Sequence, residues 1–328
     1  MNILYILGNG FDKAQGMHTS YPEFYQYLMK KECSTILEQM KKEIKEDTKL
    51  WSDMEEALGI FTNKIRTVEE MDSLHAELSE CLQDYLHQED VNYNPGVEQK
   101  NKIKSDIQHP EKYLAETDKI LFNDFVKSII RNDSKEPERY EYHVITLNYT
   151  NTFEKLFQVS SILRERPMTV LQDICHVHGQ LGDTIIIGVD NTDQIKNISF
   201  RNSDEIASFF VKVDANAAMK NLRHNNCEQL IKKANLIVLF GVSYGKTDMR
   251  WWKLIGEELK KRKDVGVISF LYCPGEIPDT RKYKLIAVEK RERERIYSKM
   301  NLYSPSFAKE INDRFFIVIN SLMFNKTK

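Results

Sequence analysis

The feature that most constrains the fold is a short apolar run at residues 2–7 that ends directly at a glycine-rich loop. The run Ile3-Leu4-Tyr5-Ile6-Leu7 is too short for a buried helix, and Gly8-Asn9-Gly10 follows it at once. A continuous apolar run of this length is typical of a strand that is buried on both faces, as in a parallel sheet. We therefore predict that residues 2–7 form an inner strand of an α/β protein.

Strand and helix patterns alternate along the second half of the chain. Further strands are predicted at residues 142–147, 169–178, 184–188, 235–240, 265–272 and 315–319. Helices are expected at residues 204–233 and 247–262, and charged helical sequence precedes the last strand. Strands that alternate with helices indicate parallel pairing through right-handed crossovers. The predicted fold class is therefore α/β, with a parallel Rossmann-like sheet.

A helical block interrupts this pattern after the first strand. Its apolar residues recur every three or four residues, which predicts helices at residues 21–31, 33–45, 50–61, 68–86 and 113–130. Residues 92–96, Asn-Tyr-Asn-Pro-Gly, predict a turn. We expect an α/β nucleotide-binding core at residues 1–16 and 140–328, with a helical insertion at residues 17–139.

Composition excludes several classes of protein. The net charge of −2 argues against a protein that chiefly grips nucleic-acid backbone. No run approaches the roughly 20 apolar residues that span a bilayer, so no membrane partner is expected. The five cysteines contain no Cys-x-x-Cys pair, which argues against a disulfide framework or a zinc knuckle. We expect a protein of the reducing cytoplasm.

Ligands of open parallel sheets bind where the strands end at their carboxyl edge, so the loops after the strands carry the functional predictions. In the first loop, Gly8-Asn9-Gly10-Phe11-Asp12, the glycines would let backbone amides approach a pyrophosphate. Lys13 stands where the dinucleotide fingerprint has its third glycine. A tight turn without a ligand remains the alternative. Asp12 would cap a helix or receive ribose hydroxyls.

The second loop follows the strand at residues 142–147. Asn148 lies at the strand end, where its amide would hold a water and a sugar hydroxyl together. Asn151 and Glu154 fit a capping box, so a helix cap is the favoured interpretation of Asn151.

The third loop contains His176-Val177-His178-Gly179. Alternation along a strand places His176 and His178 on one face. No further ligand lies nearby in sequence, and structural zinc wants four, so we expect no metal. His178, before a glycine at a strand end, suits a general base, although a lone histidine is more often structural.

The fourth loop, residues 241–248, is a second glycine-rich turn. Ser243 would bind a ribose or a phosphate, and Thr247 or Asp248 would start the next helix. Turn chemistry with a helix cap is the alternative. In the insertion, Ser52 and Glu55 fit a capping box with Trp51 as a hydrophobic staple. The alternative there is that Asp53 or Glu56 faces the ligand cleft.

Together these motifs resemble the abortive-infection AbiH family of bacterial phage-defence proteins. The motifs that carry the resemblance are Gly8-Asn9-Gly10-Phe11-Asp12, Thr19-Ser20-Tyr21, Trp51-Ser52-Asp53-Met54-Glu55-Glu56, Thr146-Leu147-Asn148-Tyr149, His176-Val177-His178-Gly179, and Gly241-Val242-Ser243-Tyr244 with Asp248. The resemblance implies a cytoplasmic protein of abortive infection.

The order of the four loops is also similar to that of the sirtuin-like NAD-binding fold. That resemblance implies that Gly8 and Gly10 hold the pyrophosphate, that Asn148 lies beside the nicotinamide ribose, and that His178 is the base. It further implies that Gly241 and Ser243 receive the adenosine end. Asn9, Phe11, Asp12 and Asp248 complete the expected binding residues. Phe11 and Asp12 replace the small residues of the sirtuin loop.

Sirtuin deacylases carry a zinc module of paired cysteines, and this chain has none. The resemblance therefore implies the other use of that fold, NAD hydrolysis, with NAD as substrate and no metal. The alternative function is a non-catalytic nucleotide sensor that acts through assembly or a partner. A toxin that acts on nucleic acid would need a basic surface or a metal cluster, and the near-neutral charge and the missing ligand set argue against it. Beyond the nucleotide, a homo-oligomer and a phage-derived trigger are open as partners.

Overall fold

A seven-stranded sheet forms the centre of the computed structural model, which describes residues 1–130, 139–157, 162–163, 169–277, 279–303 and 310–326. Its strands are β1 (Asn2–Leu7), β2 (Tyr140–Thr146), β3 (Ile162–Leu163), β4 (Thr169–His176), β5 (Leu236–Phe240), β6 (Gly266–Leu271) and β7 (Phe315–Ile319), in the order β3-β4-β2-β1-β5-β6-β7. Six strands are parallel, and the two-residue β3 runs antiparallel to β4 at the edge. The predicted α/β class with a parallel, Rossmann-like sheet is confirmed.

The strand order places a natural binding crevice beside β1. From β1 the chain builds outward to β2 and β4 on one side, and then to β5, β6 and β7 on the other. The order therefore reverses between β1 and β5, and open α/β sheets bind ligands at such a switch point. Leu7 pairs with Thr146 of β2 and with Phe240 of β5, so the loops after all three strands start at one level.

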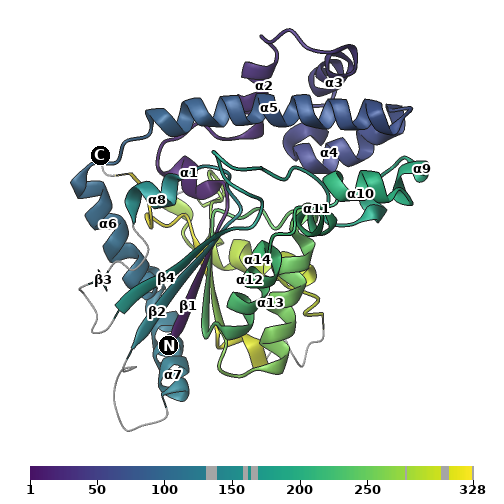
Figure 1. The fold of residues 1–328 in the computed structure, drawn as a ribbon. Coiled ribbons are helices and arrows are strands. Elements are labelled where there is room, and N and C mark those ends of the chain that lie inside the picture. The colour runs from purple at the N-terminus through teal and green to yellow at the C-terminus, as the bar shows by residue number, and fades with distance from the viewer. Residues whose placement is uncertain (131–138, 158–161, 164–168, 278, 304–309, 327–328) are drawn as a thin grey trace.

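Helices cover both faces of the sheet (Figure 1). On one face, α12 (Arg223–Lys233), α13 (Met249–Lys261) and α14 (Lys284–Lys299) pack against alternate strand residues such as Leu4 and Ile6. On the other, α1 (Gly10–Ala14), α6 (Val97–Gln108), α7 (Glu116–Ile129) and α8 (Thr152–Leu156) pack against Ile3, Tyr5 and Leu7. This alternation is the period-two pattern of a strand buried on both faces.

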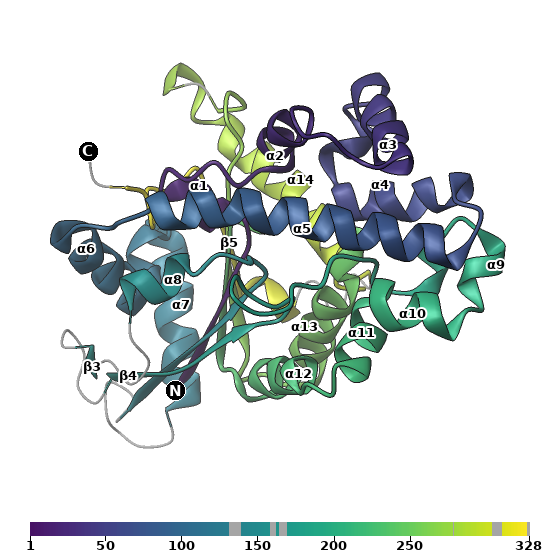
Figure 2. The same cartoon turned by 45° about the horizontal axis from the view of Figure 1, so that its top comes forward.

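A third, helical core lies across the carboxyl ends of the strands (Figures 1 and 2). It contains α2 (Tyr21–Leu28), α3 (Thr35–Glu46), α4 (Met54–Phe61) and the long α5 (Val68–Asn92). Residues 181–211, with α9 (Ile198–Arg201) and α10 (Asp204–Phe210), join it from the second half of the chain, and α11 (Lys212–Ala218) follows. The helices of residues 17–139 thus divide between this core and the face covered by α6 and α7.

Three secondary-structure predictions differ from the structure. Residues 184–188 are not a strand: Ile186 N–H donates to His178 O (2.8 Å), and their isoleucines are buried, two of them in the helical core. Helix α6 was not predicted, because its charged sequence contains few apolar residues. The helix expected at residues 204–233 is divided into α10, α11 and α12.

Among the described residues, no helix is long and apolar enough to cross a membrane.

Glycines join the loop after β1 to the loop after β5. Gly8 N–H donates to Phe240 O (2.9 Å), and Gly10 N–H donates to Gly241 O (3.0 Å). A Cβ at Gly10 would lie 2.4 Å from Gly241 Cα, and Gly241 itself has a φ of +68°. Only residues without a side chain allow two backbones to approach so closely. The glycines therefore fix the two loops at the switch point.

We predict that Gly10→Ala destabilises the protein, because the methyl group must displace backbone rather than a flexible side chain. The expected loss in the free energy of unfolding, measured by urea denaturation, is about 1–3 kcal/mol. The matched control is Gly96→Ala, where a Cβ would meet nothing within 4 Å. Equal stability of the Gly10→Ala protein and wild type would show that the two loops are not packed this closely.

Candidate active site

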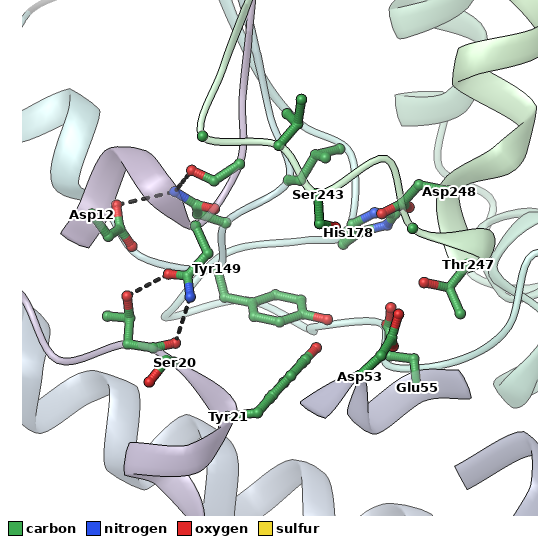
Figure 3. A pocket seen from close by; sticks show the side chains of 18 of the residues that line it. Asp12, Ser20, Tyr21, Asp53, Glu55, Tyr149, His178, Ser243, Thr247 and Asp248 are labelled. Carbon is green, nitrogen blue, oxygen red and sulfur yellow. Dashed lines mark hydrogen bonds and ion pairs between the residues drawn. The ribbon is translucent and has the colours of Figure 1, made fainter. Parts of the chain in front are cut away.

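The loops after β1, β2, β4 and β5 line one side of a cavity of about 460 Å³ (Figure 3). The other side is lined by residues 19–22, by Ser52, Asp53 and Glu55, and by two leucines of α5, so the helical core closes the cavity from above. A volume of several hundred cubic ångströms is typical of small-molecule sites. Its position at the switch point of the sheet is the one that the strand order predicts.

Most of the residues predicted for the site line this cavity. They are Gly8, Asn9, Asp12, Asn148, His178, Gly241, Ser243 and Asp248. Gly10 and Phe11 do not line it. Phe11 is buried in the core of the sheet face, where its ring packs against Phe153, Phe240 and Phe324. The large residue at position 11 is thus explained by packing.

Three amides of the first glycine loop are already engaged. Gly8 N–H donates to the last residue of β5, Gly10 N–H donates to the loop after β5, and Phe11 N–H donates to Gly8 O (2.9 Å). These N–H groups are therefore not available for a pyrophosphate, and the glycines serve close backbone packing. In the loop after β5, by contrast, no described residue accepts a hydrogen bond from the N–H of Val242 or Ser243.

Asp12 anchors the loop after β2. Its carboxylate accepts hydrogen bonds from Asn148 Nδ2 (3.0 Å) and from Thr150 Oγ1 (2.5 Å). Asn148 Nδ2 also donates to Gly8 O (3.2 Å). Burial raises the pKa of Asp12 to about 6, against these hydrogen bonds, which favour the charged form. Asp12 therefore holds Asn148 in one orientation, with the amide oxygen as its remaining polar group.

His176 has a supporting position beneath Asn148. Its Nδ1 is 3.1 Å from Asn148 O, and its Nε2 is 2.6 Å from Glu154 Oε1. Glu154 is therefore engaged by a histidine, and Asn151 makes no side-chain cap at α8. The predicted Asn151–Glu154 capping box is wrong, because the carboxylate of Glu154 binds an imidazole from the neighbouring strand instead.

His178 and Asp248 form a hydrogen-bonded pair at the cavity wall (Figure 3). His178 Nε2–H donates to Asp248 Oδ1 at 2.8 Å. Burial alone would raise the pKa of Asp248, but the charge of Lys212 and the hydrogen bond with His178 hold that pKa well below its ordinary value. His178 is 3% exposed, and its Nδ1 has no hydrogen-bond partner among the described residues. An aspartate thus orients the imidazole, and in the neutral ring that donates from Nε2 the Nδ1 atom is an acceptor.

A buried lysine links this pair to the helical core. Lys212 Nζ lies 2.8 Å from Glu55 Oε2 and 3.1 Å from Asp248 Oδ1, and it donates to Thr247 O (3.1 Å). Although burial lowers the pKa of a lysine, Asp248 and Glu55 raise that of Lys212 above its ordinary value. Burial raises the pKa of Glu55. Three segments far apart in the sequence therefore meet at one charged cluster.

Sequence reasoning missed Lys212 and misassigned Glu55. The N-cap of α4 is Asp53, whose Oδ1 accepts from Glu56 N–H (3.1 Å), so the Ser52–Glu55 capping box is wrong. Glu55 instead accepts from Lys212 and from Gly188 N–H (3.2 Å). The alternative that Asp53 faces the cleft agrees with the structure, whereas Glu56 does not line the cavity. A single lysine within Phe-Phe-Val-Lys-Val was the signal for Lys212.

The cavity is acidic. No lysine or arginine is among the described residues that line it, whereas Asp12, Asp53, Glu55 and Asp248 are. The rings of Tyr21 and Tyr149 extend into its centre (Figure 3), and burial raises the pKa of both phenols well above the ordinary value. Within the described residues, no three His, Cys, Asp or Glu side chains are grouped to hold a metal ion.

We predict that Lys212→Met is strongly destabilising, because it leaves Glu55 and Asp248 buried without a cation. The expected loss in the free energy of unfolding at neutral pH is about 3–5 kcal/mol. This loss should shrink as pH falls, because protonation then neutralises the carboxylates. Lys246→Met is the matched control, since it removes a largely exposed ion pair with Glu56 and should cost less than about 1 kcal/mol. Similar losses in both variants would contradict the role of Lys212.

We also predict a pH signature of Asp12. In the unfolded chain Asp12 loses its proton near pH 3.8, whereas in the folded protein it does so near pH 6. Its contribution to the free energy of unfolding should therefore fall by about 3 kcal/mol as pH rises through this window. Asp12→Asn removes this dependence. Urea denaturation at several pH values would show stability curves that converge or cross for the two proteins, whereas parallel curves would contradict the raised pKa.

The family model described as "Bacteriophage abortive infection AbiH" matches residues 4–270. No curated protein matches the chain. The matched region contains all four loops that line the cavity, together with Lys212 and the helical core above them. Because the match covers well over half of the 328 residues, the chain belongs to the bacteriophage abortive infection AbiH family.

Proposed function

We propose that this phage-defence protein is an NAD glycohydrolase that cleaves the bond between nicotinamide and ribose. The observation that carries the proposal is His178, a residue of the cavity lining that has one ring nitrogen fixed by Asp248 and the other without a partner among the described residues. This is the arrangement of a general base with its orienting carboxylate. The order of the four loops, which resembles that of sirtuin-like NAD-binding proteins, supplies the choice of NAD.

In the proposed reaction, water attacks the anomeric carbon of the ribose. The C–N bond breaks, nicotinamide leaves with the bonding electron pair as a neutral molecule, and a C–O bond forms to the water oxygen. His178 Nδ1 accepts the proton that the water loses. Asp248 stabilises the imidazolium through the hydrogen bond from Nε2–H. General-base catalysis of this kind contributes typically 10²–10⁴-fold to a rate.

Asn148 is proposed to position the water and a ribose hydroxyl. Asp12 and Gly8 hold its Nδ2 group, so the Oδ1 atom is the one left to accept a hydrogen bond from the ligand. This differs from the expected use of the glycine loop, because Gly8 now positions Asn148 rather than the pyrophosphate. The N–H groups of Val242 and Ser243 are the proposed phosphate donors.

The acidic lining suits the charge that develops in this reaction. Loss of nicotinamide passes through an oxocarbenium-like state, which is positive at the ribose. Preorganised carboxylates close to developing positive charge stabilise such a state, and they do so most strongly where water is excluded. The same lining disfavours a ligand with many phosphates, because no lysine or arginine among the described residues lines the cavity.

We predict that purified protein releases nicotinamide from NAD and that Asn148→Ala and His178→Ala each lower the rate at least about 100-fold. Asp248→Asn should also lower the rate, because it disturbs the tautomer and orientation of His178. His87→Ala is the control, since His87 is an exposed residue of α5. Liquid chromatography of free nicotinamide gives the rates.

Wild-type rates in both Asn148→Ala and His178→Ala would refute the assignment. Binding of NAD by calorimetry without release would instead indicate the nucleotide sensor. The buried Glu55–Lys212 contact favours that second function, because it connects the cavity wall to the helical core and would transmit binding to that surface.

A further inference from the structure

We propose that Asp53, Ser243 and Thr247 form a subsite that binds the 2′- and 3′-hydroxyls of the ribose from which nicotinamide is cleaved. The proposal rests on the proposed function and adds a ligand contact from the helical core. It assigns Ser243 to the nicotinamide ribose, whereas the sirtuin resemblance implies the adenosine end.

The three side chains surround Gly245. A Cβ at this glycine would lie 3.4 Å from Asp53 Oδ2, 3.4 Å from Ser243 Oγ and 3.8 Å from Thr247 Oγ1. All four residues line the cavity, and Figure 3 shows Thr247 facing Asp53. The missing side chain of Gly245 therefore leaves a space that is bordered by one carboxylate oxygen and two hydroxyl groups.

These oxygens lack partners among the described residues. Thr247 lines the cavity, and its hydroxyl makes no hydrogen bond to a described residue, because Lys212 binds the backbone oxygen of Thr247 instead. Asp53 Oδ1 caps α4, which leaves Oδ2 free. Burial raises the pKa of Asp53. The unpartnered oxygens of Thr247 and Asp53 border the cavity, so they are available to hydrogen-bond a ligand or water.

The conformation of the loop explains why Ser243 and Gly245 face the cavity. Tyr244 between them has a φ of +56°, and its buried ring reaches the core, where its hydroxyl shares a 2.6 Å hydrogen bond with Ser269 Oγ. A non-glycine residue in the left-handed region is uncommon and clusters at functional sites. With the Tyr244 ring directed into the core, its two neighbours are directed to the opposite side.

A carboxylate flanked by hydroxyls suits a vicinal diol. The carboxylate accepts hydrogen bonds from sugar hydroxyls, and the two side-chain hydroxyls both donate and accept. In dinucleotide sites an acidic residue similarly binds a ribose hydroxyl and repels a phosphate there. The subsite is next to the catalytic pair, because Asp248 follows Thr247 and Lys212 binds both. We therefore assign the subsite to the ribose whose anomeric carbon is attacked by the water that His178 activates.

Two variants test the subsite while preserving the fold. Gly245 has a φ of −59° and ψ of 162°, which alanine adopts without strain, so Gly245→Ala places a methyl group in the space and removes nothing. Asp53→Asn removes the charge and retains an oxygen to cap α4. Gly96→Ala, at a glycine with φ of −70° that is not among the residues lining the cavity, is the matched control. Thermal unfolding checks that each variant is folded.

Calorimetry in a His178→Ala background measures binding without consuming the ligand. The probes are NAD, NADP, and an NAD analogue whose nicotinamide ribose lacks the 2′-hydroxyl. We expect the analogue to bind at least about tenfold more weakly than NAD, because a hydrogen bond to a charged group is lost. Gly245→Ala and Asp53→Asn should weaken the binding of NAD by a similar factor. They should weaken the binding of the analogue much less. Gly96→Ala should leave both affinities unchanged.

Parental affinity for NAD in both folded variants would overturn the subsite and leave the glycohydrolase proposal standing. The variants could instead change the affinity for NADP relative to NAD and weaken binding of NAD and of the analogue equally. That result would place the subsite at the adenosine ribose and overturn the assignment. If neither wild type nor the His178→Ala protein binds NAD, the proposed function itself fails, and the subsite fails with it.

Discussion

The arrangement of the site depends on one buried cation, Lys212. Its ammonium group forms ion pairs with both Glu55 of the helical core and Asp248 of the loop after β5, and Asp248 in turn holds His178. A buried charge is tolerated only when it is paired, so each of these groups requires the others to remain in place. The helical core and the sheet edge are thereby held in the relative position that closes the cavity.

Glycines join two loops at the same edge of the sheet. The sequence places Gly8, Gly10 and Gly241 where a nucleotide-binding protein would have phosphate-binding loops, yet the structure uses the amides of Gly8 and Gly10 to join two loops. A short glycine motif requires close approach of a backbone but does not specify whether a phosphate or a second loop approaches it. In our proposal, the loop after β5 therefore binds the phosphates instead of the loop after β1.

The chemistry of the cavity follows from its charge. Four carboxylates and no lysine or arginine line it among the described residues, and in our proposal this lining binds hydroxyl-rich and positively charged parts of a ligand. NAD carries both on its nicotinamide riboside half. In our proposal, backbone N–H groups rather than lysine or arginine bind the phosphates, so no positive side chain of the cavity lining among the described residues faces the oxocarbenium-like state. This selectivity is consistent with an enzyme that acts at the ribose of nicotinamide.

The sequence by itself determined the parallel strands and the loops after them, because apolar runs and terminal glycines are local patterns. It also determined that Asn148 and His178 follow strand ends and therefore lie at the ligand-binding edge. Only the tertiary structure decided the partners of these residues. Glu55 and Lys212 are 157 residues apart, and His178 and Asp248 are 70 apart. Such pairs depend on how helices cross the sheet edge, so Glu55 and Glu154, assigned locally to capping boxes, bind distant cations and imidazoles instead.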